Sequence, residues 1–312
     1  MSIGKKILVF GATGEIGSRV ARGCVEMGHE VTGASRGINK RHRIDLHGVE
    51  LIYGDKKDKE FLKTLSAKNF NVVIDTVPGI EDVESAHKYF NGRIEHYFMC
   101  SSTGTFVPLR YLPADEDHPW REKTAVNFYR QCERDMFALK LHKEDGFPVT
   151  IFRPTNIIGA GRVPLELWGG RDISYFQLLK EGKPVEVPGD GTTLVQSGCN
   201  DDLAAAFVKG AGKGKEINGE IFIISCRKAI TLNRYLQTAR EVLKSSSPVE
   251  YLSIREILAR RPEVSPGGLN FLAEHMCFDI SKAVDYLGYS PEYTVEEGLE
   301  IALKWCLDEG IF

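Results

Sequence analysis

The fold of this chain is decided by residues 6–17, Lys6-Ile7-Leu8-Val9-Phe10-Gly11-Ala12-Thr13-Gly14-Glu15-Ile16-Gly17. A short apolar run that favours a β-strand ends at Gly11, and two further glycines follow at intervals of three residues. Gly11 suits a tight turn out of the strand, Gly14 lets the backbone approach a pyrophosphate, and Gly17 lets the next helix pack on the strand. The pattern predicts a dinucleotide-binding loop.

The segment after this loop, residues 18–27, reads as a helix. Its N-terminus would offer free backbone N–H groups and a positive dipole to an anion. We therefore expect Thr13, Glu15 and Ile16 to contact the cofactor together with the three glycines. A glycine-rich turn without a ligand is the alternative, because a glycine triplet alone is not specific.

Strand-like and helix-like segments alternate through the first half of the chain. The expected strands are residues 6–10, 30–34, 49–53, 72–76, 96–100 and 149–152, and the longer expected helices are residues 124–143, 232–243 and 295–307. Such alternation is typical of βαβ units and of a parallel sheet covered by helices on both faces. The sequence predicts an α/β fold, a Rossmann-type doubly wound parallel sheet. Residues 1–154 would form the NAD(P)-binding domain, and residues 155–312 the remaining sheet elements and a small C-terminal substrate lobe.

Composition narrows the class of protein. The chain has 312 residues, 42% of them hydrophobic, and a net charge of −3, so no general basic field would attract nucleic acid. No apolar run approaches the length of a membrane-spanning helix, and the N-terminus enters a strand without a signal-peptide pattern. Seven scattered cysteines without Cys-x-x-Cys spacing indicate free thiols and no metal site. We expect a cytoplasmic protein without membrane attachment.

The end of the second strand bears on the choice of cofactor. An NAD-preferring site would place Asp or Glu there to bind the ribose hydroxyls. This chain has Ser35 and Arg36, followed by Lys40, Arg41 and Arg43. A hydroxyl and a guanidinium suit a 2′-phosphate, which favours NADP over NAD. A solvated basic loop is the alternative.

The Gly-x-x-Gly-x-x-Gly spacing resembles that of the short-chain dehydrogenase/reductase superfamily, in its extended, epimerase/dehydratase-like branch. In that branch a Gly-Asp-x-x-Asp segment places its first Asp near the adenine amino group, and Asp55 matches it. The resemblance also implies that Thr76, Val77 and Pro78 pass under the middle of the cofactor. The branch commonly dimerises through two helices, which here would be residues 81–91 and 124–143.

The resemblance further implies a catalytic hydroxyl at Ser102, with Ser101 and Thr103 beside the substrate. The base of the family is a Tyr followed four residues later by a Lys, whose ammonium lowers the phenol pKa. Tyr129 is the well-placed tyrosine, but Glu133 stands where the Lys is expected. Glu133 could be a salt-bridging helix residue or part of a different proton relay, or a cation from elsewhere could replace the Lys. A half-buried structural role for Tyr129 also stays open.

The signature Arg153-Pro154-Thr155-Asn156-Ile157-Ile158-Gly159 resembles the Arg-x-x-Asn-x-x-Gly stretch of the same branch. It implies a cofactor contact for Arg153 and a substrate contact for Asn156. In a later motif, the Arg that grips a nucleotide-sugar diphosphate is replaced by Val195. The resemblance covers nearly the whole chain.

The predicted function is that of an NAD(P)-dependent oxidoreductase or epimerase. It would act on a hydroxyl-bearing carbon of a sugar or sugar-nucleotide-like substrate, as a homodimer, with Ser102, Tyr129 and Glu133 as catalytic residues. The alternative is a catalytically weak NAD(P)-binding protein that acts as a sensor or as an RNA-binding module. The chloroplast stem-loop-binding proteins share the fold in that way, although the acidic balance of this chain speaks against nucleic acid.

Overall fold

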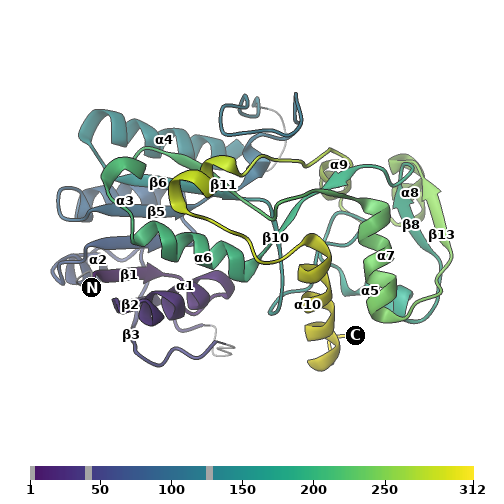
Figure 1. The fold of residues 1–312 in the computed structure, drawn as a ribbon, viewed down its shortest axis with the longest axis horizontal. Coiled ribbons are helices and arrows are strands. Elements are labelled where there is room, and N and C mark those ends of the chain that lie inside the picture. Colours follow the sequence, from purple (N-terminus) through teal and green to yellow (C-terminus); the bar gives the residue numbers. More distant parts are fainter. Residues whose placement is uncertain (1–3, 39–43, 124–128) are drawn as a thin grey trace.

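The computed structural model describes residues 4–38, 44–123 and 129–312. Within them, seven strands form one parallel sheet in the order β11-β6-β5-β4-β1-β2-β3 (Figure 1). These strands are β1 (Lys6–Phe10), β2 (Glu30–Ser35), β3 (Val49–Tyr53), β4 (Val72–Asp75), β5 (His96–Cys100), β6 (Val149–Pro154) and β11 (Ile221–Ile224). The strand order reverses beside β1, so the predicted doubly wound α/β sheet is confirmed.

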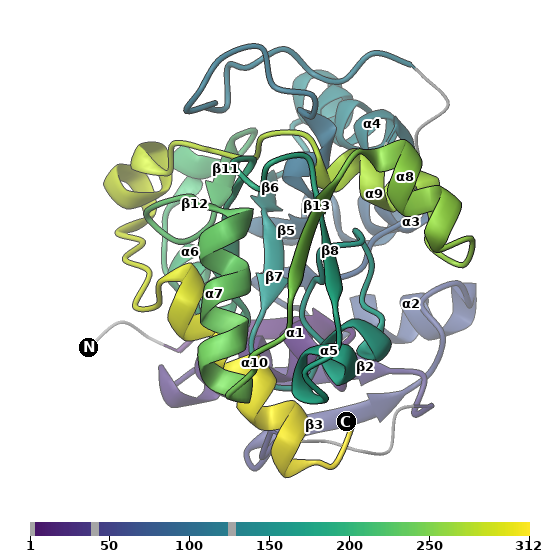
Figure 2. The same cartoon turned by 90° about the vertical axis from the view of Figure 1, so that its right-hand side faces the viewer.

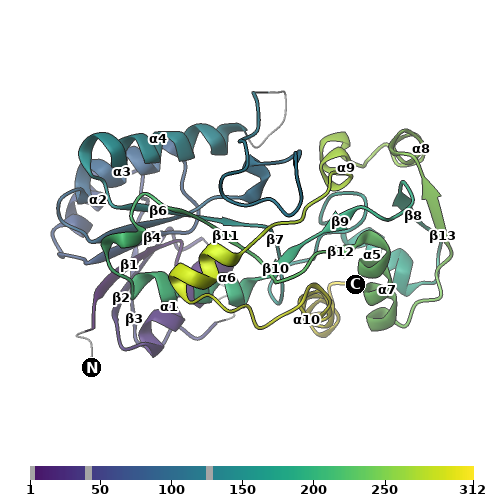
Figure 3. The same ribbon diagram turned by 45° about the horizontal axis from the view of Figure 1, so that its top comes forward.

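Helices cover both faces of this sheet. They are α1 (Glu15–Glu26), α2 (Lys59–Ser66), α3 (Ile80–Phe90), α4 (Tyr129–Asp145) and α6 (Asn200–Ala211). One apolar core joins the sheet to α1 and α6, and a second joins the opposite face to α2, α3 and α4 (Figure 3). Because both faces are buried, the central strands do not alternate between buried and exposed residues, as in β4, whose four residues are all buried.

A lobe follows β6 in the chain and lies beside the sheet (Figure 2). Its strands are β7 (Asn156–Ile158), β8 (Val185–Pro188), β9 (Leu194–Val195), β10 (Ser197–Cys199), β12 (Ile230–Thr231) and β13 (Val249–Leu252). Its helices are α5 (Ile173–Lys180), α7 (Leu232–Leu243), α8 (Ile254–Arg260), α9 (Pro266–Leu272) and α10 (Val295–Asp308). The lobe has an apolar core of its own, to which Trp168, Tyr175 and Phe176 belong. The chain returns from it to form α6 and β11.

The predicted elements agree closely with the structure in the first half of the chain. The strands at residues 49–53 and 96–100 have the predicted bounds, and α7 spans residues 232–243 as expected. The predicted helix 124–143 corresponds to α4, which is described from Tyr129 and continues to Asp145; residues 124–128 lie outside the described residues. The small strands of the lobe were not predicted, since none is longer than four residues.

No helix in the described ranges is long and apolar enough to cross a membrane.

Candidate functional site

A cavity of about 1680 Å³ lies where the carboxyl ends of the sheet strands face the lobe. This is the edge at which open α/β sheets bind ligands. Fifteen predicted site residues line it: Gly11, Thr13, Gly14, Glu15, Ile16, Gly17, Ser35, Arg36, Asp55, Thr76, Val77, Ser101, Ser102, Thr103 and Asn156. Four other predicted site residues do not: Pro78, Tyr129, Glu133 and Arg153.

The glycine loop has the shape that a dinucleotide requires. Gly11 has a φ of +77°, and its N–H donates to the carbonyl of Ala34 on β2. A Cβ at Gly11 would lie 2.7 Å from Thr76 Oγ1, and a Cβ at Gly17 would collide with the Gly11 carbonyl. Gly14 caps α1 in an extended conformation without a side chain over the helix end. The first N–H groups of α1 therefore face the cavity unobstructed, which fits a pyrophosphate.

The end of β2 is organised around Ser35. Its hydroxyl lies 2.6 Å from Thr13 Oγ1 and accepts a hydrogen bond from the Gly37 N–H at 3.2 Å. Arg36 is exposed at the cavity wall, and the contacts of the described residues give its guanidinium no partner. A free guanidinium beside this hydroxyl fits a 2′-phosphate. The other predicted basic residues, Lys40, Arg41 and Arg43, lie outside the described residues.

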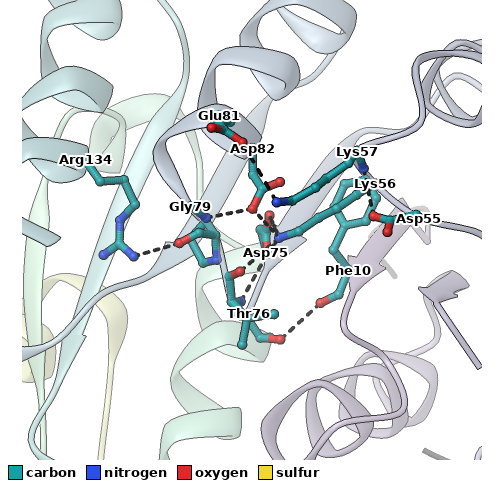
Figure 4. Close-up of polar contacts among 12 residues, drawn as sticks. Phe10, Asp55, Lys56, Lys57, Asp75, Thr76, Gly79, Glu81, Asp82 and Arg134 are labelled. Atoms are coloured by element: carbon teal, nitrogen blue, oxygen red, sulfur yellow. Dashed lines mark hydrogen bonds and ion pairs between the residues drawn. The ribbon is translucent and has the colours of Figure 1, made fainter. Parts of the chain in front are cut away.

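A buried ion cluster supports the side of the cavity that carries Asp55 (Figure 4). Lys56 Nζ lies 2.9 Å from Asp75 Oδ2 and 3.0 Å from Asp82 Oδ2, and it donates to the Val77 carbonyl at 2.9 Å. Burial raises the pKa of Asp75, and the attraction of the Lys56 ammonium works against that shift. This ion cluster ties the loop after β3, which carries Asp55, to the ends of β4 and α3.

The segment after β4 is fixed from both sides. Thr76 Oγ1 donates to the Phe10 carbonyl at 3.1 Å, and the Pro78 carbonyl accepts from Arg134 Nη1 at 2.9 Å. Val77 is 68% exposed and presents its side chain to the cavity. Pro78 thus anchors the segment to α4, while Thr76 and Val77 form the cavity wall.

Arg153 lies in a sealed network rather than in the cavity. Its guanidinium is fully buried, 3.9 Å from the ring of Trp120 and 4.5 Å from that of Phe106. Its Nε donates to Asp135 Oδ2 at 3.0 Å. Two aromatic rings and a carboxylate thus enclose the guanidinium for which a cofactor contact was expected, and it does not line the cavity.

Asp135 joins that network to the end of β5. It accepts from Ser101 Oγ at 2.6 Å and from Arg134 Nη2 at 2.9 Å. Ser102, the next residue, accepts from the Gly104 N–H at 3.1 Å and lines the cavity. Thr103 Oγ1 donates to the Pro154 carbonyl at 3.3 Å. The hydroxyls of Ser101 and Thr103 both donate to acceptors in the protein, whereas the Ser102 hydroxyl donates to none among the described residues.

The face of α4 that meets the cavity is not the one that the sequence indicates. Tyr129 lies under Lys123, whose Nζ is 5.6 Å from the ring centroid, and Glu133 Oε1 is 4.0 Å from the same Nζ. Lys123 and Glu133 are both well exposed. The cavity is lined instead by Gln131, whose Oε1 is buried without a hydrogen-bond partner. Along the described lining no tyrosine or histidine is present.

Sequence reasoning missed Gln131 because it searched for a Tyr and a Lys four residues apart. The burial pattern of α4 identifies the inward face through Cys132, Asp135 and Ala138. Gln131 and Asp135 are themselves four residues apart and lie on one side of the helix. The available signal in the sequence was the position of Asp135, three residues from both Cys132 and Ala138, because a carboxylate on an apolar helix face requires partners.

Two arginines on the lobe side were missed as well. Arg171 and Arg162 line the cavity and come from the segment 159–172, which reads in the sequence as a loop between glycines. Arg171 Nη2 donates to Asn156 Oδ1 at 2.8 Å, and Asn156 Nδ2 donates to Ser197 Oγ at 3.0 Å. Arg162 Nε lies 3.5 Å from Glu15 Oε2. No spacing in the sequence connects these residues.

The comparisons with known proteins agree with this architecture. The model of the NmrA-like family matches residues 4–88, and the model of the NAD dependent epimerase/dehydratase family matches residues 83–225. A curated relative, the chloroplast stem-loop binding protein of 41 kDa b from Arabidopsis thaliana, is 29% identical over 99% of this chain and 81% of its own length.

Two solved structures illustrate the likeness in fold. The UDP-glucose 4-epimerase of Thermotoga maritima, solved with UDP-glucose, has a TM-score of 0.75 at 18% identity and covers 98% of this chain and 100% of its own. The UDP-glucuronic acid 4-epimerase of Bacillus cereus, solved with UDP-glucuronic acid and NAD, has a TM-score of 0.77 at 19% identity, covering 97% and 99%. The two family matches thus lie on either half of the sheet, and the two solved structures share the fold of nearly the whole chain.

Proposed function

We propose that this protein binds NADP or NAD in the cavity and acts as an oxidoreductase or epimerase. Its substrate would be a sugar or sugar-nucleotide-like compound with a reacting hydroxyl-bearing carbon. The observation that carries the proposal is the continuity of the cavity, which runs from the glycine loop past Ser102 to Asn156. One volume could therefore hold a dinucleotide and a second ligand side by side.

The residues fit the cofactor at three points. The N-terminus of α1 would hold the pyrophosphate, Asp55 the adenine amino group, and Arg36 the 2′-phosphate of NADP. The bound nicotinamide would supply the hydride acceptor or donor. The preference for NADP rests on Arg36 and is part of the proposal.

On the substrate side, Ser102 would orient the reacting oxygen and Asn156 would donate a hydrogen bond. Tyr129 and Glu133 would handle the proton, with Lys123 as the cation beside them. This step requires the phenol to reach the cavity, which it does not line. The tyrosine step is therefore tested apart from cofactor binding.

The first experiment is a titration of purified protein with NADPH and NADH, followed by fluorescence, and then a turnover assay with UDP-glucose and UDP-glucuronic acid. Binding of either dinucleotide with a spectral change on adding a sugar nucleotide supports the proposal. Tyr129→Phe should reduce turnover at least a hundredfold and leave dinucleotide affinity unchanged. Full activity of this variant would contradict the tyrosine step, and no dinucleotide binding would contradict the whole proposal.

A second candidate is a catalytically weak NAD(P)-binding protein that acts as a sensor or as an RNA-binding module. It is favoured by the lack of a tyrosine or histidine along the described cavity lining and by the likeness to a stem-loop binding protein. The net charge of −3 opposes a strong electrostatic contribution to RNA binding. A stem-loop RNA that binds at 50 mM salt and is released at 200 mM, with no sugar-nucleotide turnover, would favour this candidate.

We also propose a cytoplasmic homodimer formed through α3 and α4. The seven cysteines are unpaired, as in a reducing compartment. Ile80 and Met136 are 46% and 45% exposed on these two helices, whereas Phe137 and Leu141 are packed partly against the core. Phe128, which belongs to the predicted helix 124–143, lies outside the described residues. A monomer in light scattering at micromolar concentration would contradict the dimer, and Met136→Glu should weaken it.

A further inference from the structure

Arg171 is a partly buried guanidinium whose hydrogen-bond partners carry no charge. Its Nη1 donates to the Val163 carbonyl at 2.7 Å, and its Nη2 donates to Asn156 Oδ1 and to the Ile157 carbonyl, both at 2.8 Å. These three contacts hold the guanidinium in one orientation at the cavity wall. The described residues offer its Nε no acceptor. A buried cation normally has an ionic partner, because desolvation of its charge is costly.

A second guanidinium makes this charge imbalance larger. Burial and the nearby positive charge of Arg162 lower the pKa of Arg171 to about 10. Arg162 is half exposed in the same cavity and is 3.5 Å from Glu15, which also accepts from Asn200 Nδ2 at 3.1 Å. The two guanidiniums and the one carboxylate leave one net positive charge where the lobe faces the sheet.

We propose that Arg162 and Arg171 form the subsite that binds a phosphate group of the substrate. The proposal rests on the proposed function and narrows its substrate class to phosphate-bearing compounds, such as nucleotide sugars. A planar guanidinium that is already oriented by backbone carbonyls loses little entropy when it binds an oxyanion.

This subsite would replace an interaction that the sequence lacks. The family's diphosphate-gripping arginine aligns with Val195, whose side chain is 1% exposed in the lobe core and does not line the cavity. Arg171 stands instead beside Asn156, the residue expected to contact substrate. The positive charge needed for a diphosphate would then come from the segment 159–172 instead of from β9.

The same oxyanion chemistry is present in the dinucleotide itself, whose pyrophosphate would lie at the N-terminus of α1 near Glu15. The two sources differ in what a substitution should affect. If the substrate supplies the phosphate, loss of Arg171 lowers the affinity for the substrate and leaves the affinity for the dinucleotide unchanged. If the dinucleotide supplies it, the affinity for the dinucleotide falls instead.

The test is calorimetric titration of UDP, inorganic pyrophosphate and uridine into protein with and without saturating NADP. We expect UDP to bind wild type at least tenfold more tightly than uridine. Arg171→Gln should lower UDP affinity about ten- to a hundredfold and Arg162→Gln about three- to tenfold, with uridine and NADP affinities changed less than twofold. Arg255→Gln, at an exposed position of α8, is the matched control and should change nothing.

Three results would overturn the inference: equal UDP affinity in wild type and both variants, a loss of NADP affinity as large as the loss for UDP, or no binding of either UDP or pyrophosphate. Arg162→Gln guards against misfolding, because its side chain is half exposed, and Arg171→Lys keeps the charge with a different geometry. Wild type that binds UDP but no dinucleotide would contradict the proposed function and leave the phosphate subsite standing.

Discussion

The two walls of the cavity differ in how their charges are used. On the β2–β4 wall, which is formed by the ends of β2, β3 and β4, Lys56 is paired with carboxylates inside the protein, while Arg36 is left exposed and unpaired within the described chain. On the α4 wall, the buried carboxylate of Asp135 pairs with both Arg134 and Arg153, and Gln131 alone of this helix lines the cavity. The first wall leaves a guanidinium open toward the cavity. The second wall uses its charged groups in contacts within the protein.

The largest expected effect comes from contrasting two carboxylates on α4. Asp135→Ala leaves two buried guanidiniums, those of Arg134 and Arg153, without their carboxylate and should cost about 3–5 kcal/mol of unfolding free energy. Glu133→Ala, at an exposed position, should cost less than about 0.5 kcal/mol. Urea unfolding followed by circular dichroism measures both. Equal effects would mean that the α4 wall is not an ion-paired structure.

The lobe side should respond to pH through Glu166. Burial raises the pKa of Glu166 to about 7, against which the N–H groups of Trp168 and Gly170 donate to its carboxylate. A carboxyl whose folded pKa is raised contributes stability below its unfolded pKa near 4.5, and that contribution is lost as pH rises through 7. The full shift corresponds to about 3 kcal/mol.

We therefore expect wild type to lose stability between pH 5 and pH 8 by an amount that Glu166→Gln removes. The measurement is the urea midpoint at both pH values for the two proteins. Parallel pH profiles would show that Glu166 does not titrate in this range. Because Glu166 orders the segment that carries Arg162 and Arg171, UDP binding should follow the same pH dependence.

On the β2–β4 wall, Lys56→Met removes the cation that lies between Asp75 and Asp82. It should cost about 2–3 kcal/mol, since a buried carboxylate loses its partner. The pKa of Asp75 would rise further, so the loss should be larger at pH 8 than at pH 5. Lys57→Met is the matched control, because Lys57 is exposed and lies 3.9 Å from Glu81. Similar unfolding midpoints for the two variants would contradict the role of this ion cluster.

The smallest of the four effects concerns Arg36. Arg36→Ala should weaken NADP binding by about 1.5–3 kcal/mol, roughly ten- to a hundredfold, and leave NAD binding nearly unchanged. Paired fluorescence titrations of both dinucleotides measure it. Equal NADP affinity in the variant and in wild type would rule out the 2′-phosphate contact.

The fold and the cavity-lining residues of the β2–β4 wall could be predicted from the sequence, because both depend on local sequence pattern. A strand that ends in Gly11 and a Ser35–Arg36 pair at a strand end are readable from neighbouring residues. The α4 wall depends on which helix face turns inward, and a two-position shift in that face exchanges Gln131 for Tyr129. Arg162 and Arg171 depend on a loop that folds back to the sheet, for which the sequence offers no periodic signal. The structure therefore adds most where contacts are distant in sequence.

The path of the chain between the sheet and the lobe has a consequence for dissection of the protein. The chain leaves β6 for the lobe, returns to form α6 and β11, and leaves again. A fragment that ends at residue 154 would lack β11 against β6 and lack α6 against α1, so one strand edge and part of one apolar face would be bare. Such a fragment should aggregate rather than fold. Residues 1–154 and residues 155–312 therefore depend on each other for folding, and we expect them to unfold together.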